Sequence, residues 1–197
     1  MLTLLLAAGC GCAGKADYLV SPALRTAADP RVAVLPFDNQ STDMSAPDIL
    51  RKLAEEGFAK RGYPPLNAAA VDAGLSGLGV SEGGQLPGLK PQDIGRALGA
   101  DLLCYGDVED FTFQNLGFLI RKNVTLHVRL VSAVTGETLY EGSGNGKDIK
   151  VFFNREDAKR AFVEQMAMKV VASIFKVPLK REAELSADRA LGSLPRR

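Results

Sequence analysis

The chain has 197 residues and a formal net charge of +1, so it lacks the positive surplus with which many nucleic-acid-binding proteins neutralise phosphates. Hydrophobic residues make up 46% of it, enough to bury the core of one ordinary domain flanked by tails. It contains no Trp and four Tyr, which argues against an aromatic platform for stacking single-stranded bases.

The amino terminus has the form of a lipoprotein signal peptide. The run Met-Leu-Thr-Leu-Leu-Leu-Ala-Ala-Gly-Cys is apolar, ends in small residues and is far too short to cross a bilayer as a helix. Its last five residues resemble the bacterial lipobox, so we expect residues 1–10 to form the signal segment and Cys10 to carry acyl chains such as palmitate. Gly11 rather than Asp at the next position favours the outer membrane. The Lys or Arg that usually precedes such a segment is absent, which leaves the translation start open, and the alternative is an apolar terminus without a role.

Residues 11–30 are interpreted as a tether between the lipid and the domain. Arg31 to Phe37 is a continuous apolar run, typical of a strand buried on both faces in the middle of a sheet. A loop rich in Asp, Asn, Ser and Thr (38–43) precedes a strongly indicated helix from Ser45 to Arg61, whose first residue can cap it and which Gly62 ends.

Short elements are predicted between this helix and the next strands. Tyr63 to Leu66 indicates an extended edge segment, Ala68 to Leu75 a brief helix, and Pro91 to Leu98 a second small helix with Gly99 as its cap. The glycine-rich section Gly74 to Gly88 predicts a mobile loop. Its glycines do not have the spacing of a phosphate-binding loop, and closure over another small ligand is the alternative.

Three strands are predicted around the middle of the chain: Leu102 to Phe113, Val124 to Leu130, and Thr138 to Gly142. Acidic residues interrupt the first strand and predict a bulge, and Gly136 suits a tight turn before the third. Because short turns join these strands, they form an antiparallel meander. A meander with one apolar face is not stable alone and needs helices to cover it.

The carboxyl-terminal part begins with the longest predicted helix, Asn154 to Phe175. Its second half is apolar nearly all round, so it either adds to the core or presents a partner surface, for which Val171 and Phe175 are the candidates. Residues 178–197 are charged and predict a partly disordered tail, in which Arg181 to Leu191 could form a nascent helix.

Metal and thiol chemistry find little support in the sequence. The single histidine, His127, lies on the less apolar side of its strand near Arg129 and is interpreted as a surface residue, so a site with several histidine ligands cannot form. Cys104, one of three cysteines, is interpreted as a buried small hydrophobe because no Cys-x-x-Cys pair occurs.

The densest acidic cluster is Asp107, Glu109 and Asp110 on the first meander strand. Paired carboxylates can perform acid–base catalysis, but a solvated strand end is the simpler interpretation. The oxygens of the 38–43 loop could bind a cation, yet the spacing of a calcium loop is absent and helix capping explains them. We therefore predict no catalytic residue, no metal site and no cofactor.

Basic residues gather near one end of the predicted sheet. Arg121 and Lys122 precede the second strand, and Lys147 and Lys150 follow the third. This modest basic patch suits anionic envelope polymers or lipid head groups.

The chain resembles a family of bacterial lipoproteins labelled domain of unknown function 799, of the neisserial surface-lipoprotein type. The resemblance rests on three segments in order, RVAVLPFDNQSTD, RALGADLLCYGDV and VTLHVRLVSAVTGETLYEGSG, and covers Arg31 to Gly146 behind the lipobox. Tyr140 stands where the family often has Trp. The resemblance implies a three-layer α/β domain similar to the amino-terminal domain of TolB. It also implies an accessory role in envelope transport or assembly, often as a dimer, without enzymatic activity.

We therefore predict an α/β domain at residues 31–177, with a mixed sheet that ends in an antiparallel meander packed by helices. We expect a lipid-anchored outer-membrane protein that faces the periplasm, with exposure at the cell surface as the alternative. It would bind envelope transport or assembly proteins, and no nucleic acid, through Val171 and Phe175 and through a sheet edge at Thr138 and Tyr140. The alternatives are an envelope-glycan hydrolase or transferase that uses Asp107 and Glu109, and a small-ligand-binding module.

Overall fold

The computed structural model describes residues 18–26, 29–116, 118–151, 160 and 179–197. The predicted helix Asn154 to Phe175 therefore lies outside the described residues, apart from residue 160. In chain order the elements are β1 (Tyr18–Val20), α1 (Ala23–Thr26), β2 (Val32–Val34), β3 (Asp38–Asn39), α2 (Ala46–Lys60), α3 (Ala68–Ser76), the 3-10 helix η1 (Gly83–Gly88), α4 (Pro91–Leu98), β4 (Leu102–Asn115), β5 (Leu119–Ser132), β6 (Thr138–Val151) and α6 (Lys180–Ala190).

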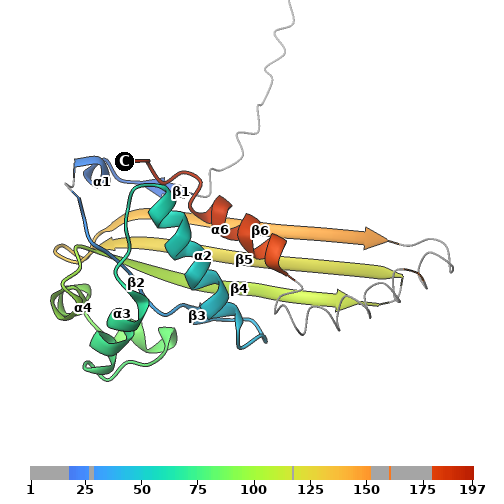
Figure 1. Cartoon of the computed structure of the whole chain (residues 1–197), viewed down its shortest axis with the longest axis horizontal. Coiled ribbons are helices and arrows are strands. Elements are labelled where there is room, and N and C mark those ends of the chain that lie inside the picture. Colours follow the sequence, from blue (N-terminus) through green and yellow to red (C-terminus); the bar gives the residue numbers. More distant parts are fainter. Residues whose placement is uncertain (1–17, 27–28, 117, 152–159, 161–178) are drawn as a thin grey trace, which may run out of the picture.

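A mixed six-stranded sheet organises the fold. Its strand order is β1-β6-β5-β4-β2, and β3 also pairs with β4 (Figure 1). Strands β2 and β3 run parallel to β4, whereas β4, β5, β6 and β1 are antiparallel neighbours. The predicted α/β class and the meander are confirmed. The three meander strands have 14 residues each; β4 nearly matches its predicted range, whereas β5 and β6 extend well beyond theirs.

Local features of the meander follow from its residues. The pairing of β4 with β5 shifts between Val108 and Asp110, which is the predicted bulge. Gly136 has a φ of 77°, a left-handed conformation that favours glycine, and its N–H donates to the Ser132 carbonyl at 2.8 Å. The predicted helices at Ser45 to Arg61, Ala68 to Leu75 and Pro91 to Leu98 are confirmed as α2, α3 and α4.

The first buried strand is not in the middle of the sheet, as its apolar run suggested. β2 is the last strand in the order, next to β4. It is completely buried because helices cover both of its faces, and because Pro65 and Leu66 bridge its outer edge, with the Leu66 N–H donating to the Val32 carbonyl at 2.8 Å. A continuous apolar run therefore indicates that both faces of the strand are covered, and does not indicate that the strand lies in the middle of the sheet.

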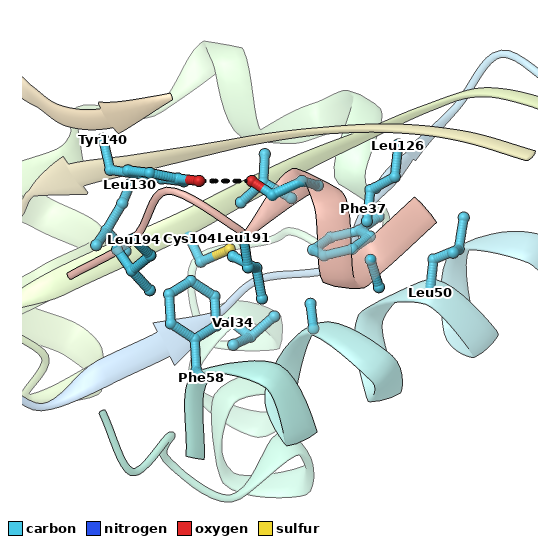
Figure 2. Packing of buried hydrophobic residues seen from close by; sticks show 14 of the residues in the cluster. Val34, Phe37, Leu50, Phe58, Cys104, Leu126, Leu130, Tyr140, Leu191 and Leu194 are labelled. Carbon is cyan, nitrogen blue, oxygen red and sulfur yellow. Dashed lines mark hydrogen bonds between the residues drawn. The ribbon is translucent and has the colours of Figure 1, made fainter. Parts of the chain in front are cut away.

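Two apolar clusters lie on opposite sides of the sheet. The larger one, between the sheet and helices α2 and α6, contains the completely buried row Val124, Leu126, Val128 and Leu130 of β5, as the alternation predicts. Figure 2 shows how residues of α2, the strands and the segment after α6 meet in this cluster. The smaller cluster packs α3, α4 and η1 against β2 and the first residues of β4.

The carboxyl-terminal segment corrects the expectation of a partly disordered tail at residues 178–197. Helix α6 packs against β6 and buries its small residues, among them Ala183, Ser186 and Ala190. It lies directly on three glycines of β6: Gly142 faces Ala190, Gly144 faces Ser186, and Gly146 faces Glu182. A Cβ on any of these glycines would overlap the helix backbone. The facing residues of α6 are four positions apart, a rise of about 6 Å, and the glycines of β6 are two positions apart, a rise of about 6.6 Å. The spacing along the helix therefore matches the spacing along the strand.

Two further segments are ordered where the sequence suggested a tether and a mobile loop. Within residues 11–30, β1 pairs with Tyr140–Gly142 of β6, and Leu24 is completely buried in the larger cluster. Within Gly74–Gly88, the chain completes α3 and forms η1, where Gly83 lies against the backbone of Phe37 too closely to admit a side chain. None of the described helices has the length and apolar character needed to cross a bilayer.

The glycine contact between β6 and α6 predicts a large loss of stability in Gly144→Ala. The added methyl group would overlap the Ser186 carbonyl, so we expect the free energy of unfolding in urea to fall by about 3 kcal/mol or more. Gly88→Ala is the matched control, because a Cβ there meets nothing within 4 Å, and it should change stability by less than about 0.5 kcal/mol. Equal effects of the two substitutions would contradict this packing.

Candidate functional site

One face of the meander is left largely uncovered by the described helices. α2 and α6 pack on the other face, whereas α3 and α4 lie at the base of the meander, beside β2, the start of β4 and the β5–β6 turn. In Figure 1 the three long strands run on past these helices. We call the uncovered side the open face. Its residues are Tyr105, Asp107, Asp110 and Thr112 of β4, Asn123, Thr125, His127 and Arg129 of β5, and Glu141, Ser143 and Asn145 of β6.

A histidine between two carboxylates forms the centre of the open face. His127 Nδ1 lies 3.4 Å from Asp107 Oδ2, and His127 Nε2 lies 2.9 Å from Glu141 Oε1. The hydrogen bond with Asp107 is the main cause that raises the pKa of His127; burial opposes the rise, and Glu141 adds to it. Because both ring nitrogens face carboxylates, the site favours the doubly protonated imidazolium, which can donate from both nitrogens, more than water does.

Charged and aromatic groups surround this histidine. The Arg129 guanidinium lies 5.2 Å from the centre of the Tyr105 ring, in the geometry of a cation–π contact. A hollow of about 410 Å³ lies beside His127 and is lined by Tyr18, Leu19, Glu109, His127, Glu141 and Ser143. The hollow therefore joins the edge strand β1 to the bulge of β4 across the open face.

Amide and carboxylate side chains continue the open face away from His127. Asn123 Nδ2 donates to Asp110 Oδ2 at 2.6 Å, and Asn145 Nδ2 donates to Asn123 Oδ1 at 2.9 Å and to Thr125 Oγ1 at 2.8 Å. Thr112 also donates to Asp110. These groups hold one another in place across three strands, so the surface is ordered before any partner arrives.

The arrangement is suited to binding rather than to nucleophilic catalysis. Both nitrogens of His127 are engaged by carboxylates, so neither is directed at a hydroxyl or thiol. Cys104 is completely buried, and burial raises the pKa of its thiol, which fits its predicted role in the core. Among the residues that the structure describes, no group of His, Cys, Asp and Glu side chains could hold a metal ion.

Two of the residues that the sequence analysis proposed for partner contact are buried or half-buried in the structure. Tyr140 is completely buried and donates from its hydroxyl to the Ala190 carbonyl at 2.7 Å, so it belongs to the core (Figure 2). Burial raises its pKa to about 12. Thr138 is half-buried at the start of β6, and β1 already occupies the neighbouring sheet edge. Cys10, Val171 and Phe175 lie outside the described residues.

The structure also shows where the acidic residues of β4 and the polar residues of the 38–43 loop lie. The bulge separates Asp107, which contacts His127, from Glu109, which is exposed beside the hollow. In the 38–43 loop, Asn39 accepts from the Ser41 N–H and hydroxyl, and the Ser45 hydroxyl donates to Asp43 rather than capping α2 itself. The loop residues therefore bond one another, and the predicted side-chain cap of α2 by Ser45 does not form.

A second hollow gives the small-ligand alternative a location. It has a volume of about 430 Å³ and lies between the loop that precedes α2 and the start of η1, with Phe37, Met44 and Gly83 in its wall. Asp38, Asp48 and Glu82 line it as well, so it would favour a cationic ligand.

Comparisons with known proteins agree with the resemblance seen in the sequence. The profile of the GNA1162-like lipoprotein family matches residues 17–190, so the predicted kinship with neisserial surface lipoproteins is confirmed. The match extends beyond Arg31 to Gly146 at both ends and includes all of β1 and α6. A search of curated proteins finds no match.

Solved structures share the fold at low sequence identity. Lipoprotein GNA1162 from Neisseria meningitidis is 19% identical, with a TM-score of 0.57 over 75% of this chain and 99% of that one. The PelC dodecamer from Paraburkholderia phytofirmans is 14% identical, with a TM-score of 0.54 over 91% of this chain and 96% of that one. These likenesses establish the shared fold.

The carboxylate-flanked histidine predicts a pH-dependent stability difference between wild type and His127→Gln. A folded-state pKa above the ordinary value of about 6.5 stabilises the protein fully below that value, and the gain is lost as pH rises through the folded-state pKa. Because both carboxylates are about two-fifths exposed, we expect wild type to be more stable by roughly 0.5–1 kcal/mol near pH 6. The difference should vanish in alkaline solution; urea unfolding at several pH values measures it, and a constant difference would contradict the assignment.

Proposed function

The chain belongs to the GNA1162-like lipoprotein family, and on that premise we propose that it is a lipid-anchored accessory protein of the bacterial envelope. It acts without catalysis, by binding protein partners in envelope transport or assembly. Its anchor is the acylated Cys10, which places the domain in the periplasm at the outer membrane. Anchoring raises the local concentration of the domain near membrane-bound partners.

The observation that carries this proposal is the open face. An ordered polar surface with the partly exposed side chains of His127, Asp107 and Glu141 at its centre offers directional hydrogen bonds to a partner at little cost in conformational entropy. Arg129 and Tyr105 are of the residue types enriched at protein interfaces. The bulge of β4 separates Asp107, which contacts His127, from Glu109, and this argues against the hydrolase alternative that uses the two carboxylates together.

Self-association is part of the proposal. PelC, which shares the fold, forms a dodecamer, so assembly of several copies is as reasonable as the dimer that the sequence resemblance implied. Val171 and Phe175 remain proposed contacts for such an assembly.

The proposal predicts that partners contact the open face of the anchored protein. A photo-crosslinking amino acid at Ser143, which lies opposite His127 on β6, should capture envelope proteins or a second copy in intact cells. The matched control places the same group at Lys52, which is exposed on α2 on the other side of the sheet. Mass spectrometry identifies the captured proteins.

Anchoring is tested in the same experiment with Cys10→Ser. Loss of the acyl chains should move the protein out of the membrane fraction and weaken capture at Ser143, because the local concentration falls. Equal capture from Ser143 and Lys52 would reject the open face as the partner surface. Unchanged membrane association of Cys10→Ser would reject the anchor.

A further inference from the structure

The end of the meander farthest from α4 combines exposed apolar and basic side chains. We call it the distal tip and define it as Leu116, the segment Phe118–Lys122 and the segment Lys147–Val151. It comprises the described residues between β4 and β5, the start of β5 and the end of β6, and it extends past the described helices (Figure 1).

Four large apolar side chains of the distal tip are exposed. The exposed fractions are 59% for Leu116, 60% for Phe118, 46% for Ile149 and 48% for Val151. Ile149 pairs with Arg121 and Val151 pairs with Leu119, so these side chains share the side of the sheet that carries the open face. The apolar character thus begins where the amide network of the open face ends.

Positive charge accompanies these apolar side chains. The distal tip has four basic residues, Arg121, Lys122, Lys147 and Lys150, and one acidic residue, Asp148, in a chain whose formal net charge is only +1. Lys122 Nζ lies 3.8 Å from Glu182 Oε1. The other three basic residues, Arg121, Lys147 and Lys150, form no ion pair with any described residue. Three cations are therefore available to an anionic surface.

We propose that the distal tip docks on a phospholipid bilayer rich in anionic head groups. Exposed Phe and Leu side chains can enter the boundary between head groups and acyl chains, while Lys and Arg extend to the phosphates. A protein partner fits less well, because the centres of protein interfaces are depleted of Lys. This contact goes beyond the lipid anchor and does not require acylation of Cys10.

Docking of the distal tip would fix the orientation of the domain. About 30 Å of β6 separate Gly142, where β1 joins the sheet, from Val151. A lipid upstream of β1 and a second contact at the distal tip would hold the domain at two points and limit its rotation about the anchor. Two weak contacts on one molecule reinforce each other through effective concentration.

The absence of Trp allows a site-specific test. In the Cys10→Ser chain, Phe118→Trp creates a lone fluorescent reporter at the distal tip. Val134→Trp is the matched control, because Val134 is 77% exposed in the β5–β6 turn at the opposite end of the same strands. Vesicles are made of phosphatidylcholine alone or enriched in phosphatidylglycerol, with and without brominated acyl chains.

The expected result is a blue shift of Phe118→Trp emission, and quenching by brominated lipid, with the phosphatidylglycerol vesicles only. Val134→Trp should not respond. Binding carried by the apolar amino terminus alone would leave both reporters in water, so no response at position 118 overturns the proposal. An equal response to pure phosphatidylcholine overturns the role of the anionic head groups. A blue shift that needs no vesicles and grows with protein concentration indicates association of copies and also overturns it.

The charge requirement has its own variants. Replacing Lys147→Glu together with Lys150→Glu in the Phe118→Trp chain should weaken vesicle binding about tenfold or more, because each basic residue near an anionic surface contributes to the affinity. Lys52→Glu together with Lys60→Glu on α2 makes the same change in net charge and should leave the affinity unchanged. Equal losses in the two variants would indicate a general charge effect and overturn the specific role of the distal tip.

Discussion

The structure depends on the direct contact between the backbone of α6 and three glycines of β6. With no side chain between them, the helix lies close enough for the Ser186 hydroxyl to donate to the Gly144 carbonyl at 2.9 Å and for Tyr140 to reach the Ala190 carbonyl. The segment after α6 then closes the larger apolar cluster with Leu191 and Leu194. Arg197 also joins this segment to α1, because its guanidinium donates to the Leu24 carbonyl at 2.8 Å.

This packing decides which surface is available for function. Because α2 and α6 cover only one side of the meander, the other side meets solvent and carries polar side chains. These side chains bond one another, as His127 does with Glu141 and Asn145 with Thr125. Along the strands, the chemistry changes from a histidine with two carboxylates, through amides, to the apolar and basic distal tip. Different partners, protein near the base and lipid at the far end, are consistent with that change. The family membership agrees with a lipoprotein of the bacterial envelope.

Local signals in the sequence sufficed for elements that are determined by neighbouring residues. The Pro91 start and the Gly99 cap predicted α4, Gly136 predicted its turn, and the alternation from Val124 to Leu130 predicted the buried side of β5. Tertiary packing decided the rest. The glycines from Gly142 to Gly146 were interpreted as the end of a strand, because glycine is common in turns. No local pattern indicates that a helix about forty residues later packs on them. His127 read as an ordinary surface residue, because its contacts with Asp107 and Glu141 depend on the register of three strands. β1 and α6 were read as tails for the same reason, since each acquires its structure from β6.

The central claim is that the open face is occupied when the protein works in the envelope. Hydroxyl-radical footprinting, compared between the lipidated protein in native envelopes and the purified chain, tests it most directly. Tyr105 and His127 are the reactive side chains of the open face, and Met44, which is 86% exposed before α2, is the internal reference. Oxidation of Tyr105 and His127 should fall in the envelope, while oxidation of Met44 should stay the same. Unchanged oxidation of Tyr105 and His127, or equal protection of all three residues, would contradict it.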